Sequence, residues 1–193
     1  MTKEEIFLKY KEIFDFANVG RELEKIVDVE KFMVTPAAPL IDSGVAYEGA
    51  IMYHTVMVYH FANKLLPIYN NIYQGQIDPK SLAKVIVLQQ LGKVGMFEPN
   101  KDEWQSKKLG KVYTFTETNV CLKTGERSKM ICGNAGVIFT PEEYEAMSIL
   151  DKTPEEYENM TKYRCPMSTI FKNASDMAYA VERERYKATL KKS

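Results

Sequence analysis

The sequence predicts a mainly helical protein folded as one domain. Apolar residues recur at helical spacing over most of the chain, whereas only one segment alternates as a strand does. Two copies of Thr-Pro-Glu-Glu, at 140–143 and 153–156, have the pattern of a helix-capping box. A length of 193 residues is enough for one compact domain and marginal for two, so residues 1–193 are treated as a single domain.

N-terminal helices are expected within residues 1–30. The first runs from Lys3 to Asn18, where apolar side chains return every three or four positions, and Gly20 ends it. A shorter helix runs from Arg21 to Val29. The stretch VTPAAPLIDSGVAYEG, residues 34–49, is interrupted by proline and glycine, which indicates an ordered loop.

Residues 50–190 are expected to form the core. A helix from Ala50 to Asn70 is apolar nearly all round, which favours a place at the centre of the domain, and Pro67 should kink or end it. Asp78 and the proline after it have the pattern of an N-cap followed by the first helical residue. The helix that starts there runs to a pair of glutamines at 89–90.

The segment KVYTFTETNVCL, residues 111–122, alternates and is rich in β-forming residues, which predicts a small β-hairpin inserted in the core. Helical character returns from Arg127 to Ala135. Thr140 and Thr153 each begin a helix through the capping pattern. The last helix is expected at about residues 167–190.

Composition excludes several classes of protein. Lys and Arg number 26, as do Asp and Glu, so the net charge gives no indication of a nucleic-acid or membrane partner. Three distant cysteines without a CxxC motif argue against a disulfide framework and a structural zinc site, and they favour a cytoplasmic location. The N-terminal stretch resembles neither a signal nor a transit peptide, and no apolar run is long enough to span a membrane.

Few side chains suggest catalysis. The two histidines, His54 and His60, lie six positions apart on one predicted helix, so they cannot form a chelating pair. No phosphate-binding loop, dinucleotide fingerprint, HExxH or GxSxG motif is present. On periodicity alone, His54 is interpreted as a hydrogen-bonded core residue, because the sequence nominates no nucleophile for it to activate.

Seven segments, taken in order, resemble those of the HD-domain metal-dependent phosphohydrolases, in the form common in bacteria and their phages. They are TPAAP (35–39), YEGAIMYHTVMVY (47–59), VIVLQQLGKVGMFEPN (85–100), VYTFTET (112–118), LKTGERSKMI (122–131), FTPEEYEAMSIL (139–150) and FKNASDMAYAVE (171–182). The resemblance extends over residues 6–185 and implies an HD-like helical bundle. It also implies a bacterial or phage-encoded protein of the cytoplasm, of the infected cell or of the virion.

The sequence keeps the family's residue at two positions of the metal site and differs from the family at the others. His54 matches the first histidine ligand, and Asp176 matches the final aspartate ligand. The His-Asp pair that names the family is replaced by Gln89 and Gln90.

Two further histidines of the family pattern are absent. Thr124 stands at the histidine of the Gly-His-Gly segment, and the histidine of the later helix falls near Leu150. Divalent metals in such sites need several imidazole nitrogens and carboxylate oxygens together, and a glutamine carbonyl carries no net charge. The resemblance therefore implies a catalytically degenerate domain without a metal cofactor. The alternative is a metal-dependent phosphohydrolase of nucleotides or oligonucleotides that holds Mn, Ni or Fe in a reduced site.

Several residues remain candidates under either hypothesis. If the protein is active, His54, Asp176, Lys93 and Asp42 would carry the reaction; otherwise His54 and Asp176 would form a buried hydrogen bond between two helices. The predicted ligand-binding residues are Gln89, Gln90, Lys93 and Arg127.

Each of these ligand-binding assignments has a plainer alternative. The two amides can bind a small polar ligand or fill the vacated cavity, and the two basic residues can contact a phosphate or serve as structural charges. The expected partner is a protein or a small phosphate-containing ligand, and nucleotide binding without hydrolysis is a third possibility. Glu48 and Glu126 match glutamates of the family, and Glu48 is interpreted as a turn-region or capping group and not as a catalyst. Trp104 and Tyr113 are interpreted as local packing, whereas an exposed aromatic there would indicate a partner surface.

Overall fold

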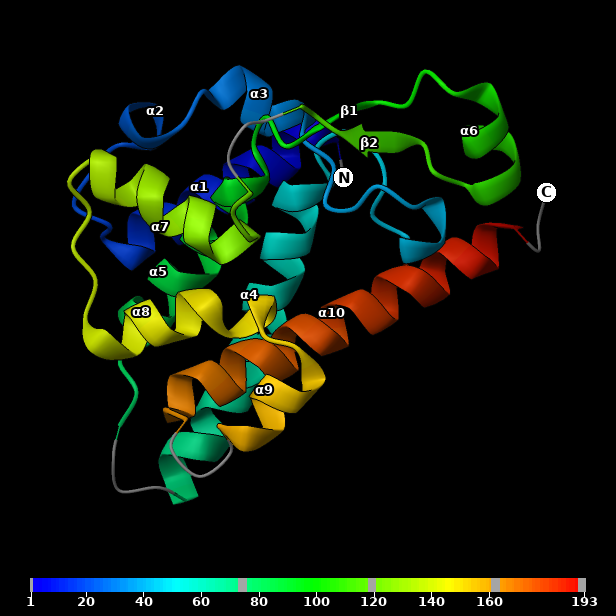
Figure 1. The fold of residues 1–193 in the computed structure, drawn as a ribbon. Coiled ribbons are helices and arrows are strands. Elements are labelled where there is room, and N and C mark those ends of the chain that lie inside the picture. The colour runs from blue at the N-terminus through cyan, green and yellow to red at the C-terminus, as the bar shows by residue number, and fades with distance from the viewer. Residues whose placement is uncertain (1, 73–75, 118–120, 161–163, 191–193) are drawn as a thin grey trace.

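The computed structural model of the chain describes residues 2–72, 76–117, 121–160 and 164–190, and is mainly helical, as predicted (Figure 1). The α-helices of the described residues are α1 (Lys3–Ala17), α2 (Leu23–Ile26), α3 (Val29–Val34), α4 (Ala50–Ile72), α5 (Pro79–Gln89), α6 (Glu103–Leu109), α7 (Thr124–Asn134), α8 (Pro141–Ser148), α9 (Pro154–Asn159) and α10 (Pro166–Leu190). The described residues also form three short 3-10 helices, η1 (Ile41–Ser43), η2 (Gln90–Lys93) and η3 (Ile149–Asp151), and two strands, β1 (Phe97–Pro99) and β2 (Tyr113–Phe115).

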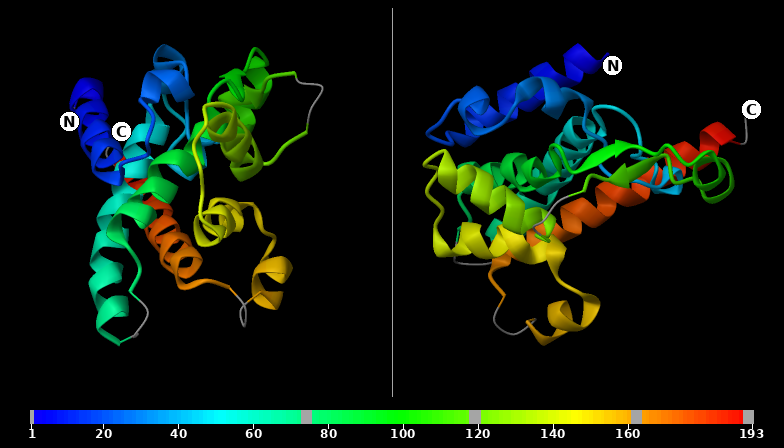
Figure 2. Two further views of the ribbon diagram at one scale, coloured as in Figure 1. Left: turned by 90° about the vertical axis from the view of Figure 1, so that its left-hand side faces the viewer. Right: turned by 45° about the horizontal axis from the view of Figure 1, so that its top comes forward.

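Helix α4 lies at the centre of the fold. It packs against α1, α5 and α10, and α10 crosses it diagonally along much of its own length (Figures 1 and 2). The expected central position of this helix is thus confirmed. Ile51 and Met52 of α4, Ile86 of α5 and Phe171 of α10 are all buried in the shared core.

The N-terminal region differs in detail from the sequence prediction. Thr2 caps α1 through a complete capping box with Glu5. The helix ends at Asn18, whose φ of 49° is left-handed, and not at Gly20. The predicted second helix is divided into α2 and α3, because Val27 is extended and Asp28 caps a new helix through the Lys31 N–H.

Proline 67 does not end α4, which continues through it to Ile72. The predicted start of α5 is confirmed, since the Asp78 carboxylate accepts the N–H groups of Lys80 and Ser81. The capping boxes at Thr140 and Thr153 likewise open α8 and α9.

The small β element differs from the predicted hairpin. Residues 113–115 do form a strand, but β2 pairs antiparallel with the upstream β1, which joins Phe97 to Phe115 in register. The connection contains α6, a helix that the periodicity did not reveal, with Asp102 as its N-cap and Gly110 at φ 63° after its end. Residues 118–120 of the expected hairpin lie outside the described part of the chain.

No helix within the described ranges combines the length and the apolar character needed to cross a membrane.

Candidate functional site

A polar pocket of about 200 Å³ lies where the end of α5, the start of α7, η3 and the middle of α10 meet. The residues from α5 and η2 that line it are Gln89, Gln90 and Lys93. Those from α7 and η3 are Thr124, Leu150 and Asp151. Those from α10 are Lys172, Ser175, Asp176 and Tyr179.

The pocket gathers most of the candidate residues that the sequence nominated. Gln89, Gln90, Lys93 and Asp176 all line it, although they come from segments more than 80 residues apart in the chain. His54, Arg127 and Asp42 do not line it. The structure thus brings four of the nominated residues together and leaves three of them elsewhere.

The two glutamines are buried and face each other. The Gln90 side-chain N–H donates to Gln89 Oε1 over 2.8 Å, as expected for amides that hydrogen-bond locally. The Ser128 hydroxyl fixes the turn beneath them, because it donates to the Gln89 carbonyl at 2.5 Å and accepts the Gly92 N–H at 2.7 Å. Gly92 is required here, since a Cβ would lie 2.1 Å from the Thr124 carbonyl oxygen.

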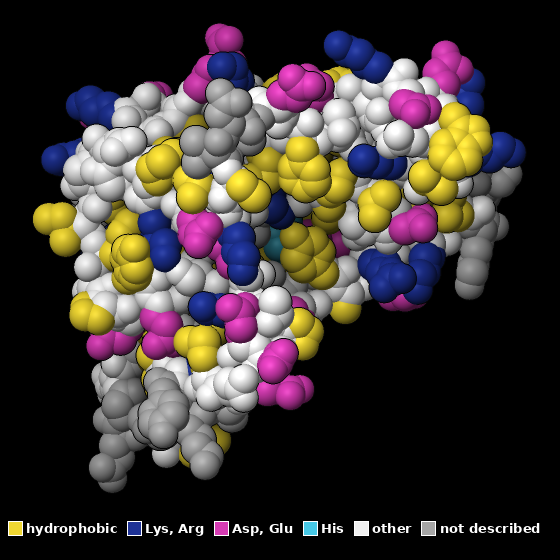
Figure 3. All heavy atoms as spheres, in the orientation of Figure 1, with side chains coloured by type: hydrophobic (Ala, Val, Ile, Leu, Met, Phe, Trp, Pro, Cys, Tyr) yellow, Lys and Arg dark blue, Asp and Glu magenta, His cyan; other side chains and the backbone are white. Residues whose placement is uncertain are grey.

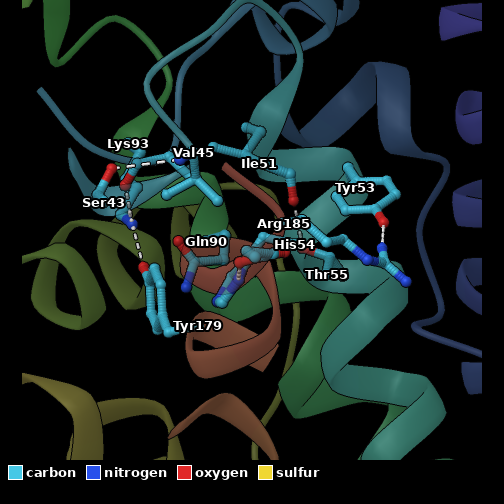
Figure 4. A network of polar contacts seen from close by, with 12 residues as sticks. Ser43, Val45, Ile51, Tyr53, His54, Thr55, Gln90, Lys93, Tyr179 and Arg185 are labelled. Carbon is cyan, nitrogen blue, oxygen red and sulfur yellow. Dashed lines mark hydrogen bonds and ion pairs between the residues drawn. The ribbon is translucent and has the colours of Figure 1, made fainter. Parts of the chain in front are cut away.

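Lys93 projects from η2 and is almost fully buried. Its ammonium group donates to the Ala37 carbonyl at 2.5 Å and lies 3.3 Å from the Tyr179 hydroxyl (Figure 4). A lysine ammonium carries three N–H groups. These two contacts therefore leave one N–H of Lys93 for a further acceptor.

His54 is the buried, hydrogen-bonded core residue that periodicity suggested, but its partner is not Asp176. His54 Nδ1 lies 2.9 Å from Glu182 Oε2, and the two residues are 0% and 3% exposed. Burial lowers the pKa of His54, although the Glu182 carboxylate opposes that shift. The predicted link between α4 and α10 therefore exists, with a glutamate six positions further along α10.

Helix geometry explains why Asp176 takes no part in that link. Six positions along a helix correspond to a large rotation about its axis, so Asp176 and Glu182 cannot face the same neighbour. Asp176 forms an ion pair with Lys172 at 2.5 Å, and its side chain is 58% exposed. Glu182 instead continues the buried stripe of Ala174 and Ala178 at four-residue spacing, which was a readable signal for a buried carboxylate.

Asp151 lines the pocket as well, although no sequence motif pointed to it. Its carboxylate accepts the Gly125 N–H at 2.8 Å and so caps the first turn of α7. Burial raises the pKa of this carboxyl group, while hydrogen bonds from the backbone of α7 oppose the shift.

Arg127 does not reach the pocket. Its Nη2 donates to the Val94 carbonyl at 3.1 Å, so the plainer reading of a structural charge describes its contact. Glu126 accepts the Lys123 N–H at 2.8 Å and caps α7.

The remaining candidates also lie elsewhere. Asp42 is exposed on η1, and Glu48 lies before α4 within 3.9 Å of the Lys3 ammonium group. Trp104 is an exposed residue of α6, so local packing does not describe it. Tyr113 belongs to β2, and partial burial raises its pKa.

The residues present do not fit a divalent metal ion. Within the described ranges, no group of three or more His, Cys, Asp or Glu side chains is arranged to hold one. The pocket offers two carboxylates, of which Asp176 is paired with Lys172 and Asp151 caps α7. His54 directs one ring nitrogen to Glu182, and neutral amides and hydroxyl groups supply the remaining oxygen atoms of the pocket.

Fold and site together define a mainly helical domain with a polar pocket between its helices. Comparisons of the chain with protein-family models, with curated proteins and with solved structures give no match.

Proposed function

We propose that this chain is a catalytically degenerate HD-like domain that functions by binding, as a ligand-binding or structural protein. One observation carries the proposal. The resemblance assigns six positions to metal ligands. Five of them, Gln89, Gln90, Thr124, Leu150 and Asp176, line the same pocket, whereas the sixth, His54, does not. These positions were assigned from sequence motifs alone, so their convergence in space supports the assignment.

The chemistry of the pocket supports the loss of catalysis. Hydrolysis of a phosphoester by a metal-bound water needs an ion held by several charged or imidazole donors. An amide, an amide, a hydroxyl and an aliphatic side chain stand at four of the five positions, namely Gln89, Gln90, Thr124 and Leu150. The carboxylate at the fifth position is already paired with a lysine.

A role in binding accounts for the polar pocket that remains after the loss of the metal ligands. The resemblance suggests a protein partner or a small phosphate-containing ligand, and the balanced charge of the chain favours neither nucleic acid nor a membrane as the partner. The number and spacing of the cysteines favour a reducing cytoplasm, and the resemblance suggests that of a bacterium or of an infected cell.

One observation favours the alternative of a reduced metal-dependent phosphohydrolase. Asp151 adds a second carboxylate to the wall that already contains Asp176. In that case the ion would be Mn, Ni or Fe, and it would have to displace both the Lys172 ion pair and the cap of α7.

Metal content separates the two functions. The purified protein would be incubated with Mn²⁺, Ni²⁺ or Fe²⁺, desalted and assayed for bound metal and for phosphodiesterase turnover. We expect neither. About one ion per chain together with turnover would reject the degenerate domain in favour of the enzyme.

A restored variant tests the assignment of the lost ligands. Gln89→His, Gln90→Asp and Thr124→His introduced together should produce metal retention that the natural chain lacks. Gln76→His, which adds an imidazole at an exposed position, is the matched control and should retain no more metal than the natural chain. Failure of a folded restored variant to bind metal would remove the support that the pocket gives to the resemblance.

A further inference from the structure

Two buried side-chain atoms of residues that line the pocket lack hydrogen-bond partners among the described residues. They are Gln90 Oε1 and Ser175 Oγ, on residues 4% and 1% exposed. An unsatisfied buried polar atom costs about 1–3 kcal/mol, so a folded protein normally pairs such groups. Both atoms belong to residues that line the pocket, which makes a bound molecule the natural source of the missing partners.

The charges around the pocket already balance. Lys172 and Asp176 neutralise each other at 2.5 Å, and the wall contains one further cation, Lys93, and one further carboxylate, Asp151. Behind the wall, Glu182 adds another buried carboxylate beside His54. The face of the molecule in Figure 3 likewise mixes basic and acidic side chains. The wall therefore contains two cations and two carboxylates, and this balance favours a ligand without net charge.

The hydrogen-bonding groups that remain available indicate which donor and acceptor the ligand has. Gln90 Oε1 lacks a donor among the described residues, and Lys93, with two partners, can donate one more N–H to an acceptor. In the view of Figure 4, Gln90 lies between His54 and the Lys93–Tyr179 pair, so this acceptor and this donor belong to neighbouring side chains. Tyr179 also lines the pocket and supplies an aromatic wall for a flat ring.

We infer that the pocket binds a small, neutral, planar lactam, whose ring N–H donates to Gln90 Oε1 and whose carbonyl accepts from Lys93 Nζ. Ser175 Oγ, which can donate or accept, would serve a substituent of the ring. The volume of about 200 Å³ corresponds to roughly six water molecules of liquid, which suits a single six-membered ring. The inference rests on the proposed binding function and names its ligand class.

The probes are 2-pyridone and N-methyl-2-pyridone, which share a flat ring and a carbonyl but differ in the N–H donor. Titration calorimetry and saturation-transfer NMR on the natural chain should detect binding of 2-pyridone. The methylated compound should bind about tenfold more weakly or not at all, because it leaves Gln90 Oε1 unpaired. Equal binding of the two compounds, tighter binding of inorganic phosphate, or no binding of 2-pyridone would each overturn the inference.

Variants locate the ligand. Gln90→Leu should abolish binding of 2-pyridone, whereas Gln76→Leu at an exposed position should not change it. Lys93→Met, which removes the proposed donor to the carbonyl, gives a second test if Gln90→Leu does not fold, and circular dichroism of the unliganded variants checks folding. Unchanged affinity in a folded Gln90→Leu or Lys93→Met protein would refute the site.

Measuring metal in the same preparation separates two kinds of failure. A metal-loaded natural chain would refute the proposed function, whereas a metal-free chain that ignores 2-pyridone would refute the lactam alone.

Discussion

Replacing Glu182 by leucine should lower the free energy of unfolding by about 1–3 kcal/mol, the cost of a buried donor left without an acceptor. The structure supports the upper part of that range. His54 Nδ1 and Glu182 Oε2 lie 2.9 Å apart, and neither residue is reached appreciably by water. Leucine removes the acceptor and leaves the imidazole N–H buried. Glu182→Gln keeps an acceptor for that N–H and should change stability by less than about 1 kcal/mol.

A double-mutant cycle makes the test specific to the pair. Replacing His54 and Glu182 together by leucine removes both polar partners, so the double variant should be more stable than the sum of the single changes predicts, by about 1–2 kcal/mol. Urea unfolding followed by circular dichroism measures each corner, and Glu184→Leu on the exposed face of α10 is the matched control. A coupling within about 0.3 kcal/mol of zero would show that the pair contributes no mutual stabilisation, contrary to this reasoning.

Three further predictions concern other parts of the fold. Burial lowers the pKa of His54, so the unfolded chain binds a proton there more readily than the folded one. This contribution to stability is fully present above about pH 6.5 and is lost as the pH falls below it. The dependence of the free energy of unfolding on pH should diminish in His54→Leu and persist in His60→Leu. Urea midpoints measured across pH 5–8 test this. Gly92→Ala should cost about 3 kcal/mol or more, because the new Cβ would lie 2.1 Å from a carbonyl oxygen. Gly133→Ala, with nothing described within 4 Å of its Cβ, should be neutral or stabilising by up to about 1 kcal/mol; equal thermal shifts for the two would contradict the close approach. Asp151→Ala should cost about 1 kcal/mol through loss of the cap on α7, whereas Asp151→Asn keeps an acceptor and should cost less; the difference in melting temperature between them is the measurement.

The sequence predicted helices most reliably where a local interaction fixes their start. Asp78, Thr140 and Thr153 each cap a helix through groups two or three residues away, so a short window contains the whole interaction. Helix α6 was missed because its seven residues include no buried side chain in the described structure and therefore no apolar stripe. Only its flanking residues, Asp102 and Gly110, indicated it.

Strand pairing was predicted less well for a related reason. The alternation at residues 111–122 identified β2, but the register of β2 is set by β1, fourteen residues or more upstream. Contacts from the loop before α4 also hold it, since the Tyr113 N–H donates to the Pro39 carbonyl and Leu40 bridges to Lys111. Alternation within a segment carries no information about which distant segment will pair with it.

The candidate site shows the same division between local and distant information. The order of the motifs predicted that the glutamines and Asp176 lie near one another, and they line one pocket. It could not determine which carboxylate on α10 contacts His54. That choice depends on the rotation of α10 about its axis, and the buried stripe through Ala178 and Glu182 sets that rotation. Asp151 was missed because it acts through a backbone N–H of another helix, which no motif records.

The unsatisfied polar atoms support the proposal that the pocket is a binding site and not a collapsed remnant. His54 Nε2, Gln90 Oε1, Ser175 Oγ and Glu182 Oε1 all lack partners within the described structure, and they surround the contact between α4, η2 and α10. A core with no function to serve could replace such groups by apolar ones at no loss, since removing both members of a buried polar pair is nearly neutral. Proteins keep locally unfavourable groups where a ligand makes use of them. The two amides beside a buried lysine therefore support the proposed binding of a molecule that hydrogen-bonds to them.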